Sequence, residues 1–122
     1  MGKIKRFEDL NSWQKARQLT NVIYDFSGEG KFAKDFELRN QIRSAAGSAM
    51  HNIAEGFDAG TDAEFGRFLK MARRSASEVQ SQLYLALDRR YITETQRQTA
   101  YNLATEVKRL INGLLSYLNN SN

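Results

Sequence analysis

The side chains best suited to binding chemistry are basic residues on the helix predicted over residues 62–90. At about 100° per residue, Arg67, Lys70 and Arg74 project within about 60° of one another, and Arg73 lies nearer the edge of the apolar stripe. The apolar stripe of the same helix faces the other way. Guanidinium and ammonium groups on one helix face are typical contacts to phosphate. This face is therefore a candidate phosphate-binding surface.

A second basic pair lies on the helix predicted over residues 36–56. Arg39 and Arg43 are one turn apart, beside a side of that helix made of small residues. Lys3, Lys5 and Arg6 add positive charge near the start of the chain. Repeated around a symmetric oligomer, such modest patches would form one continuous electropositive surface.

The alternative interpretation of these charges is an ordinary solvated surface with local ion pairs. Asp35 lies four residues before Arg39, and Glu78 lies four residues after Arg74, so both pairs have the spacing of helical ion pairs. The chain carries 18 Lys and Arg against 14 Asp and Glu, a net charge of +4. The acids are interspersed with the bases, so the charge total does not decide between the two interpretations.

Catalytic and metal-binding patterns are weak. The one histidine, His51, pairs at helical spacing with Glu55, but no second histidine completes a metal shell. Ser44 and Ser48 lie on the same side of the helix as His51, which suggests a serine nucleophile with a histidine base. The backbone amides in the middle of a helix are already hydrogen-bonded, however, and cannot form the oxyanion hole that such a nucleophile needs. Without cysteine there is no thiol nucleophile or thiolate metal site. We therefore expect no enzyme activity, no metal and no cofactor.

The elements that carry these residues are four helices in one domain. With 122 residues and no proline, the chain is long enough for one core over residues 1–122, with a flexible basic start over about residues 1–8. Glycine clusters and capping boxes, at Thr61 to Glu64 and Thr93 to Gln96, separate helices near 12–27, 36–56, 62–90 and 94–119. Four such helices with short connections predict an all-α, up-and-down antiparallel four-helix bundle.

The apolar residues on three of these helices cover more of the circumference than one bundle core requires. We interpret this surplus on the first, second and fourth helices as a surface for self-association, the alternative being a generous monomer core. No apolar run reaches the roughly 20 residues of a membrane span, and no signal segment begins the chain. We expect a cytoplasmic protein with no membrane partner.

Two consecutive segments resemble a known family. The segments Gln41 to Ser48 (QIRSAAGS) and Asn52 to Phe57 (NIAEGF) closely resemble the signature of bacterial four-helix-bundle proteins first noted as products of intervening sequences in 23S rRNA genes. Further matches run from Phe7 to Ala16 and from Glu64 to Glu78, so the resemblance covers nearly the whole chain. It implies an up-and-down bundle, commonly a homopentamer, with an RNA-related role. The same family is similar to accessory proteins of diversity-generating retroelements, which bind a reverse transcriptase and its template RNA.

The chain departs from the family pattern at two places. Where the family usually has Ser-Ile-Pro-x-Asn, this chain has Ser48-Ala49-Met50-His51-Asn52, so the second helix should lack a proline kink. Where a glycine often precedes the serine of the third helix, this chain has Arg74, which adds a charge to the candidate face.

Within this fold, Asn52, Glu55 and Gly56 are interpreted as structural. We expect them to close the second helix and fix its turn into the third, with Gly56 in a left-handed C-terminal conformation. Glu55 near a helix C-terminus opposes the macrodipole, which predicts a basic partner, Arg43 or Arg73, from this or a neighbouring subunit.

These observations predict a non-enzymatic, homo-oligomeric protein, a pentamer by resemblance, that binds RNA or another nucleic acid through repeated basic faces. The residues expected to carry binding are Arg39, Arg43, Arg67, Lys70, Arg73 and Arg74. Two alternatives remain open: an accessory subunit that binds a reverse transcriptase and its template RNA, and a purely structural protein-interaction scaffold.

Overall fold

The computed structural model describes residues 3–120, and helices make up nearly all of this range. In chain order the elements are the 3-10 helix η1 (Phe7–Asp9) and the α-helices α1 (Asn11–Ser27), α2 (Gly30–Lys34), α3 (Phe36–Asp58), α4 (Asp62–Asp88) and α5 (Glu94–Asn120). No strand occurs in the described range. The all-α prediction is confirmed, and the four predicted helices correspond to α1, α3, α4 and α5.

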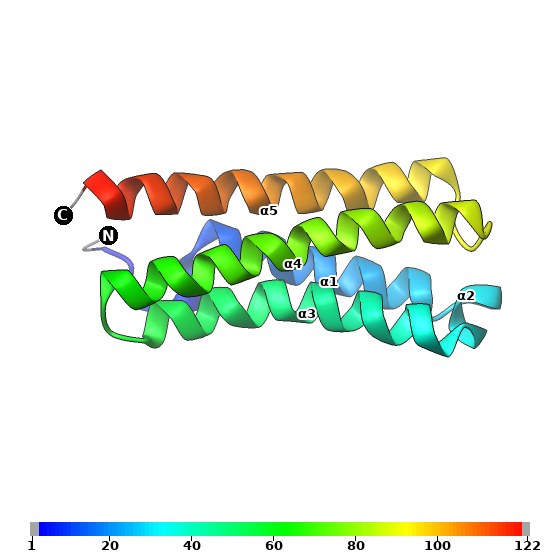
Figure 1. Cartoon of the computed structure of the whole chain (residues 1–122), viewed down its shortest axis with the longest axis horizontal. Helices are drawn as coiled ribbons and strands as arrows, with labels where there is room; N and C mark the ends of the chain where they lie inside the picture. Colours follow the sequence, from blue (N-terminus) through cyan, green and yellow to red (C-terminus); the bar gives the residue numbers. More distant parts are fainter. Residues whose placement is uncertain (1–2, 121–122) are drawn as a thin grey trace.

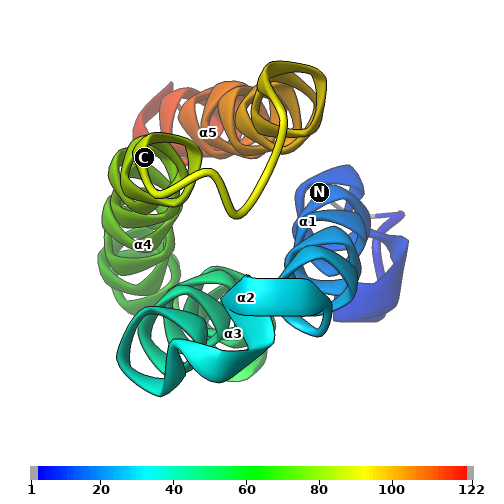
Figure 2. The same cartoon turned by 90° about the vertical axis from the view of Figure 1, so that its right-hand side faces the viewer.

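The four long helices lie side by side, and each runs back along the one before it (Figure 1). Seen from the end that carries α2, they are placed around a square in the order α1, α3, α4, α5 (Figure 2). The contacts follow this order, since α3 packs on α1 and α4, and α5 packs on α4 and α1. The contact between α1 and α3 and the contact between α4 and α5 therefore lie on opposite sides of the molecule.

The core fills the space between the four apolar stripes and has two halves. In the half near α2, Leu19 of α1, Ile42 of α3, Leu83 of α4 and Ala104 of α5 pack together. The other half contains Trp13, Ile53, Leu69, Val107 and Ile111. Burial of these side chains stabilises the fold at about 25 cal/mol per Å² of apolar surface. Alternating polar and apolar helix faces thus account for the bundle.

Threonine side chains fix the starts of the last two helices, as the capping signals predict. At α5 the Thr93 hydroxyl accepts from the Gln96 N–H at 3.1 Å, and the Gln96 side chain accepts from the Thr93 N–H at 2.9 Å. At α4 the Thr61 hydroxyl accepts from the Glu64 N–H at 3.2 Å, but the Glu64 carboxylate pairs with Arg67 instead of returning to Thr61. The first capping box is therefore only half formed.

The turn between α3 and α4 differs from the prediction. Helix α3 continues through Gly56 to Asp58, and the left-handed residue is Gly60, with φ of 95°. The predicted C-terminal role of Gly56 is therefore wrong. A Cβ at Gly56 would lie 2.6 Å from Cβ of Phe68 and 3.1 Å from Cδ1 of Phe65, so glycine is needed there for the close approach of α4.

The chain before α1 contributes to the core. Sequence patterns gave no sign of η1, which lies at the end of the predicted flexible start, or of the short α2, which lies in the connection between the predicted helices 12–27 and 36–56. Ile4 and Phe7 pack against the half of the core around Trp13, and the Phe7 and Trp13 rings meet edge to face at 5.2 Å. The predicted flexible segment, about residues 1–8, thus includes residues that contact the bundle. Its first two residues lie outside the described range.

Asp35 joins the start of α3 to the α4–α5 connection and gives the fold a testable response to acid. Its carboxylate accepts from the Leu38 N–H at 3.1 Å and from the Tyr91 hydroxyl at 2.8 Å. These two bonds, with the nearby charge of Arg89, hold the pKa of Asp35 below its ordinary value. The expected ion pair between Asp35 and Arg39 is not formed, because Arg39 donates to the Ala33 carbonyl instead.

Acid should weaken the fold through Asp35. Because the folded-state pKa is lowered, its contribution is complete above about pH 4, the value for an unfolded aspartate, and is lost as pH falls through the folded-state pKa. Asp35→Asn keeps a capping oxygen but does not titrate, so its stability should fall less than that of the wild type below about pH 4. Urea unfolding followed by circular dichroism at several pH values measures this. Identical acid profiles for the two proteins would contradict it; Glu37→Gln is the control.

Candidate nucleic-acid interface

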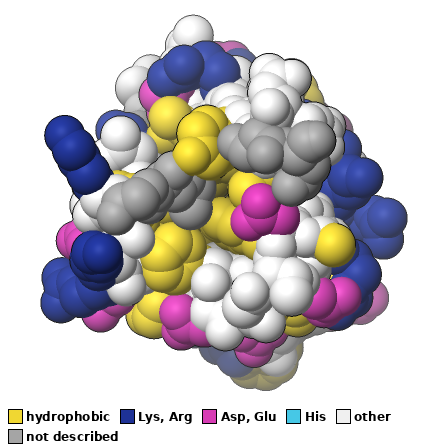
Figure 3. Space-filling view, turned by 90° about the vertical axis from the view of Figure 1, so that its left-hand side faces the viewer, with side chains coloured by type: hydrophobic (Ala, Val, Ile, Leu, Met, Phe, Trp, Pro, Cys, Tyr) yellow, Lys and Arg dark blue, Asp and Glu magenta, His cyan; other side chains and the backbone are white. Residues whose placement is uncertain are grey.

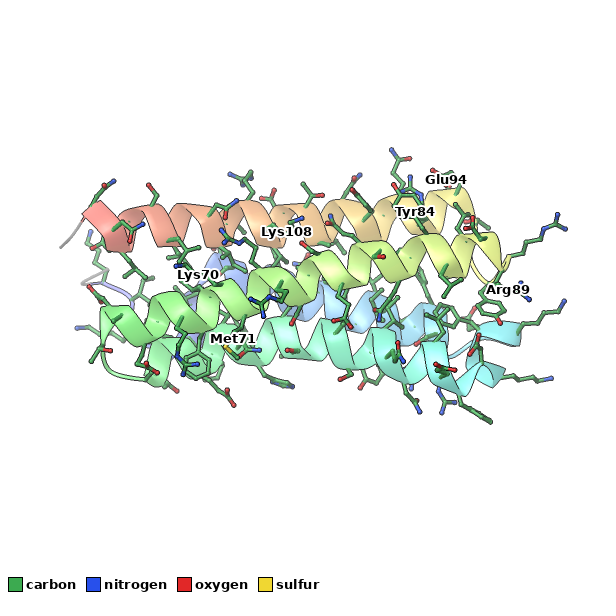
Figure 4. All side chains as sticks on the ribbon, viewed as in Figure 1. Lys70, Met71, Tyr84, Arg89, Glu94 and Lys108 are labelled. Carbon is green, nitrogen blue, oxygen red and sulfur yellow. The ribbon has the colours of Figure 1, made fainter. Side chains whose placement is uncertain are left out.

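Four of the six predicted basic residues meet in one surface groove, between the first half of α4 and the second half of α5. Two adjoining hollows, of about 460 and 390 Å³, share Lys70 and Arg74 as lining residues. We call their lining the α4–α5 groove; its charged members are Asp62, Arg67, Lys70, Arg73, Arg74 and Lys108. Lys70 and Lys108 extend between the two helices (Figure 4), and Met71 also lines the larger hollow.

Hydrogen bonds between α4 and α5 fix two of these cations. Arg73 donates from Nη1 to Oδ1 of Asn112 at 2.8 Å. Lys108 donates from Nζ to Oε1 of the buried Gln80 at 3.0 Å, and Gln80 donates in turn to the Thr105 hydroxyl at 2.9 Å. These partners are neutral, so Arg73 and Lys108 keep their full positive charge while their positions are restricted.

Among the cations of the α4–α5 groove, Lys70 and Arg74 are the two that have no partner in the described part of the chain. Both are exposed, and neither makes a hydrogen bond or ion pair within residues 3–120. The expected pairing of Arg74 with Glu78 is not formed; Glu78 accepts from Gln82 instead. Two charges without partners, held beside two positioned ones, favour an anion-binding groove over a surface of self-neutralised charges.

Arg67 lies at the edge of the groove and is engaged by its own helix. It pairs with Glu64 at 2.9 Å, and its guanidinium lies 4.7 Å from the centre of the Phe68 ring. The hydrogen bond and the opposite charge lower the pKa of Glu64 and raise that of Arg67. Because Glu64 already pairs with its charge, Arg67 is less available to an anion than Lys70 or Arg74.

The other predicted pair, Arg39 and Arg43, lies on the side of α3 that contacts α2 and α1, away from the α4–α5 groove. Arg43 donates to the hydroxyl of the buried Ser27 at 2.7 Å and covers the Tyr24 ring at 4.5 Å. Arg39 donates to the Ala33 carbonyl at 3.0 Å. These arginines are half-buried and connect α3 to α1 and α2. The six predicted residues therefore do not form one surface within a single chain.

Of the three residues interpreted as a structural motif, Asn52 and Gly56 lie near the contact between α3 and α4, whereas Glu55 does not take part in it. The Asn52 side chain donates to both the carbonyl and the hydroxyl of Ser48, at 2.8 and 2.9 Å, and Ser75 of α4 donates to that same hydroxyl at 3.0 Å. Asn52 thus positions Ser48, which contacts α4 through Ser75, and does not close the helix. Glu55 is exposed and has no ion pair among residues 3–120, so the predicted pairing with Arg43 or Arg73 of the same chain is wrong.

Other site chemistry finds little support in the described part of the chain. No three His, Asp or Glu side chains come close enough together there to hold a metal ion. His51 and Ser44 are both exposed, on the outer side of α3. None of the helices within residues 3–120 combines the length and the hydropathy that a bilayer crossing requires.

Sequence reasoning missed Lys108 and the neutral partners of the groove. Lys108 follows Val107 in the apolar stripe of α5, where a single charge attracts no attention. Its importance depends on the rotation of α5 against α4, which periodicity does not specify. One signal could have indicated Lys108: it is a basic residue beside the apolar stripe of its helix, and the preceding helix of the chain carries a basic row.

The fold and the groove define a class: small all-helical bundle proteins with a positively charged groove on one side. Within this class, the chain belongs to the 23S rRNA-intervening sequence protein family, whose model matches residues 8–113. The structure is similar to that of a protein of unknown function from the S23 ribosomal protein family of Bacteroides thetaiotaomicron VPI-5482, with a TM-score of 0.78 and 27% identity. The match covers 85% of this chain and 97% of that protein. A search of curated proteins gives no match.

Proposed function

We propose that this up-and-down bundle is a non-enzymatic, cytoplasmic, homo-oligomeric protein that binds RNA by contacting phosphates in the α4–α5 groove. The observation that carries the proposal is the pair Lys70 and Arg74, exposed and without partners beside the positioned Arg73 and Lys108. Asp62 is the one acidic side chain among the described residues that line the two hollows. Such a site favours anions with several charges, and an RNA backbone provides them at regular spacing.

Self-association would multiply this groove around a symmetry axis. Large apolar side chains stand exposed on the single chain, among them Tyr24, Phe36, Tyr84 and Leu85, and Phe36 is 62% exposed. At the end that carries both termini, apolar side chains gather around the centre beside acidic ones, and Lys and Arg lie towards the edge (Figure 3). A homopentamer, as the family resemblance implies, would cover some of these exposed apolar side chains. It would also bring five α4–α5 grooves together, so that weak phosphate contacts act jointly.

A second candidate is a protein-interaction scaffold, and Phe36 with Leu85 favours it. Leu85 lines a surface hollow beside the start of α3, and the Phe36 side chain is exposed at the start of the same helix. A protein partner that covers these side chains would bind mainly by apolar burial and with little dependence on salt. An accessory role beside a reverse transcriptase and its template RNA would use both this surface and the groove.

The salt dependence of RNA binding tests the proposed function. A labelled RNA hairpin is titrated with the protein at about 50 and about 200 mM salt, while light scattering gives the mass of the protein. With three or more phosphates contacted, the affinity should fall at least about tenfold over this interval. Absence of binding at the lower salt by a well-formed oligomer, or affinity that does not change with salt, would overturn the proposal and favour the scaffold.

A further inference from the structure

The larger hollow of the α4–α5 groove has an apolar wall beside its charges. Its volume of about 460 Å³ lies within the usual range of small-molecule clefts, about 300–1,000 Å³. Ala63 and Gly66 of α4 and Leu115 and Leu118 of α5 form the apolar part, while Lys70 and Arg74 stand at its edge. A phosphate contact alone would require only the charges. The apolar wall indicates a ligand with a flat or apolar group next to its phosphates.

Gly66 keeps this hollow open without being required by the fold. It lies inside α4, where glycine costs about 1 kcal/mol relative to alanine. A Cβ at this position would meet only Cδ2 of Leu115, at 3.9 Å, which is an ordinary contact. The situation at Gly56 is the opposite, because a Cβ there would collide with Phe68. Packing thus explains Gly56 but not Gly66.

We infer that the α4–α5 groove binds a single-stranded segment of RNA, with one base in the hollow and the adjoining phosphates on Lys70 and Arg74. The inference depends on the proposed function and makes it more specific. In a duplex the bases are stacked and paired, so a base enters a side hollow only after the duplex opens locally, whereas an unpaired base enters at no such cost. Burial of a base face against Leu115 then adds to the phosphate contacts.

The test compares a labelled single-stranded RNA with a duplex of the same length, and wild-type protein with Gly66→Leu. The leucine side chain fills the hollow without changing charge. We expect the wild type to bind the single strand more tightly, and Gly66→Leu to lose about tenfold of that affinity while duplex binding is unchanged. Gly113→Leu is the matched control, since Gly113 also lies in a long helix and a Cβ there meets nothing within 4 Å.

A ligand-side measurement keeps the test decisive if Gly66→Leu does not fold. A single-stranded RNA whose central nucleotides lack their bases keeps every phosphate, so wild-type protein should bind it about tenfold more weakly than the intact strand. Equal affinity for the intact and base-free strands, equal affinity for single strand and duplex, or full single-strand affinity in Gly66→Leu would overturn the inference and leave the proposed function standing. Failure of both RNAs to bind at low salt would overturn the proposed function itself.

Discussion

Gly56→Leu is expected to destabilise the fold strongly. A Cβ at this position would lie 2.6 Å from Cβ of Phe68, a distance that real side chains do not show, and the rest of the leucine side chain has to enter the same contact. Overpacking a core typically costs about 1–3 kcal/mol, and separating two packed helices costs more, out of a total stability of about 5–15 kcal/mol. We expect a loss of at least about 3 kcal/mol in urea unfolding followed by circular dichroism.

The control for this prediction is Gly113→Ala. Gly113 also lies within a long helix, but a Cβ there would meet no atom within 4 Å. Alanine should therefore raise the stability by about 0.5–1 kcal/mol through helix propensity alone. If Gly56→Leu and Gly113→Ala change the stability by similar amounts, the close approach of α3 and α4 at Gly56 is not the reason for the glycine.

The helices were predictable from sequence because each carries its own signal. Glycine clusters and capping boxes place α1, α3, α4 and α5 within two residues of their observed ends, and Thr61 and Thr93 mark helix starts through bonds made within one turn. The role of Gly56 at the end of α3 was predicted wrongly because its reason is not local. In the sequence Gly56 resembles a glycine that ends a helix, but the contact that requires glycine there comes from Phe68 on α4.

The α4–α5 groove was only half predictable. The basic row on α4 follows from the helical repeat, which places Lys70 and Arg74 together whatever surrounds them. The inclusion of Lys108, and the exclusion of Arg39 and Arg43, depend on which helices are neighbours and how each is rotated. Partners that are distant in sequence, such as Asn112 for Arg73, decide which charges are available. Local spacing instead predicted Asp35 as the partner of Arg39 and Glu78 as the partner of Arg74, and neither pair is formed.

Reversing two charges in the α4–α5 groove should nearly abolish RNA binding. In the double variant Lys70→Glu, Arg74→Glu, two phosphate contacts are lost and two repulsive charges take their place. Each lost contact should reduce the slope of log affinity against log salt by about 0.7–0.9, and at low salt we expect the affinity to fall by about 100-fold or more. Both positions are exposed and without partners in the described range, so the fold should be unaffected. Fluorescence titration at several salt concentrations measures both quantities.

Lys31→Glu, Lys34→Glu is the matched control, because it changes the net charge by the same amount elsewhere on the molecule. These exposed lysines lie on α2, which crosses between α1 and α3 at the end of the bundle, away from the groove (Figure 2). If binding depends on local phosphate contacts, this control should lose only a few-fold of the affinity, through the long-range field that salt screens. Equal losses in the two double variants would mean that net charge alone attracts the RNA, and that the α4–α5 groove is not where it binds.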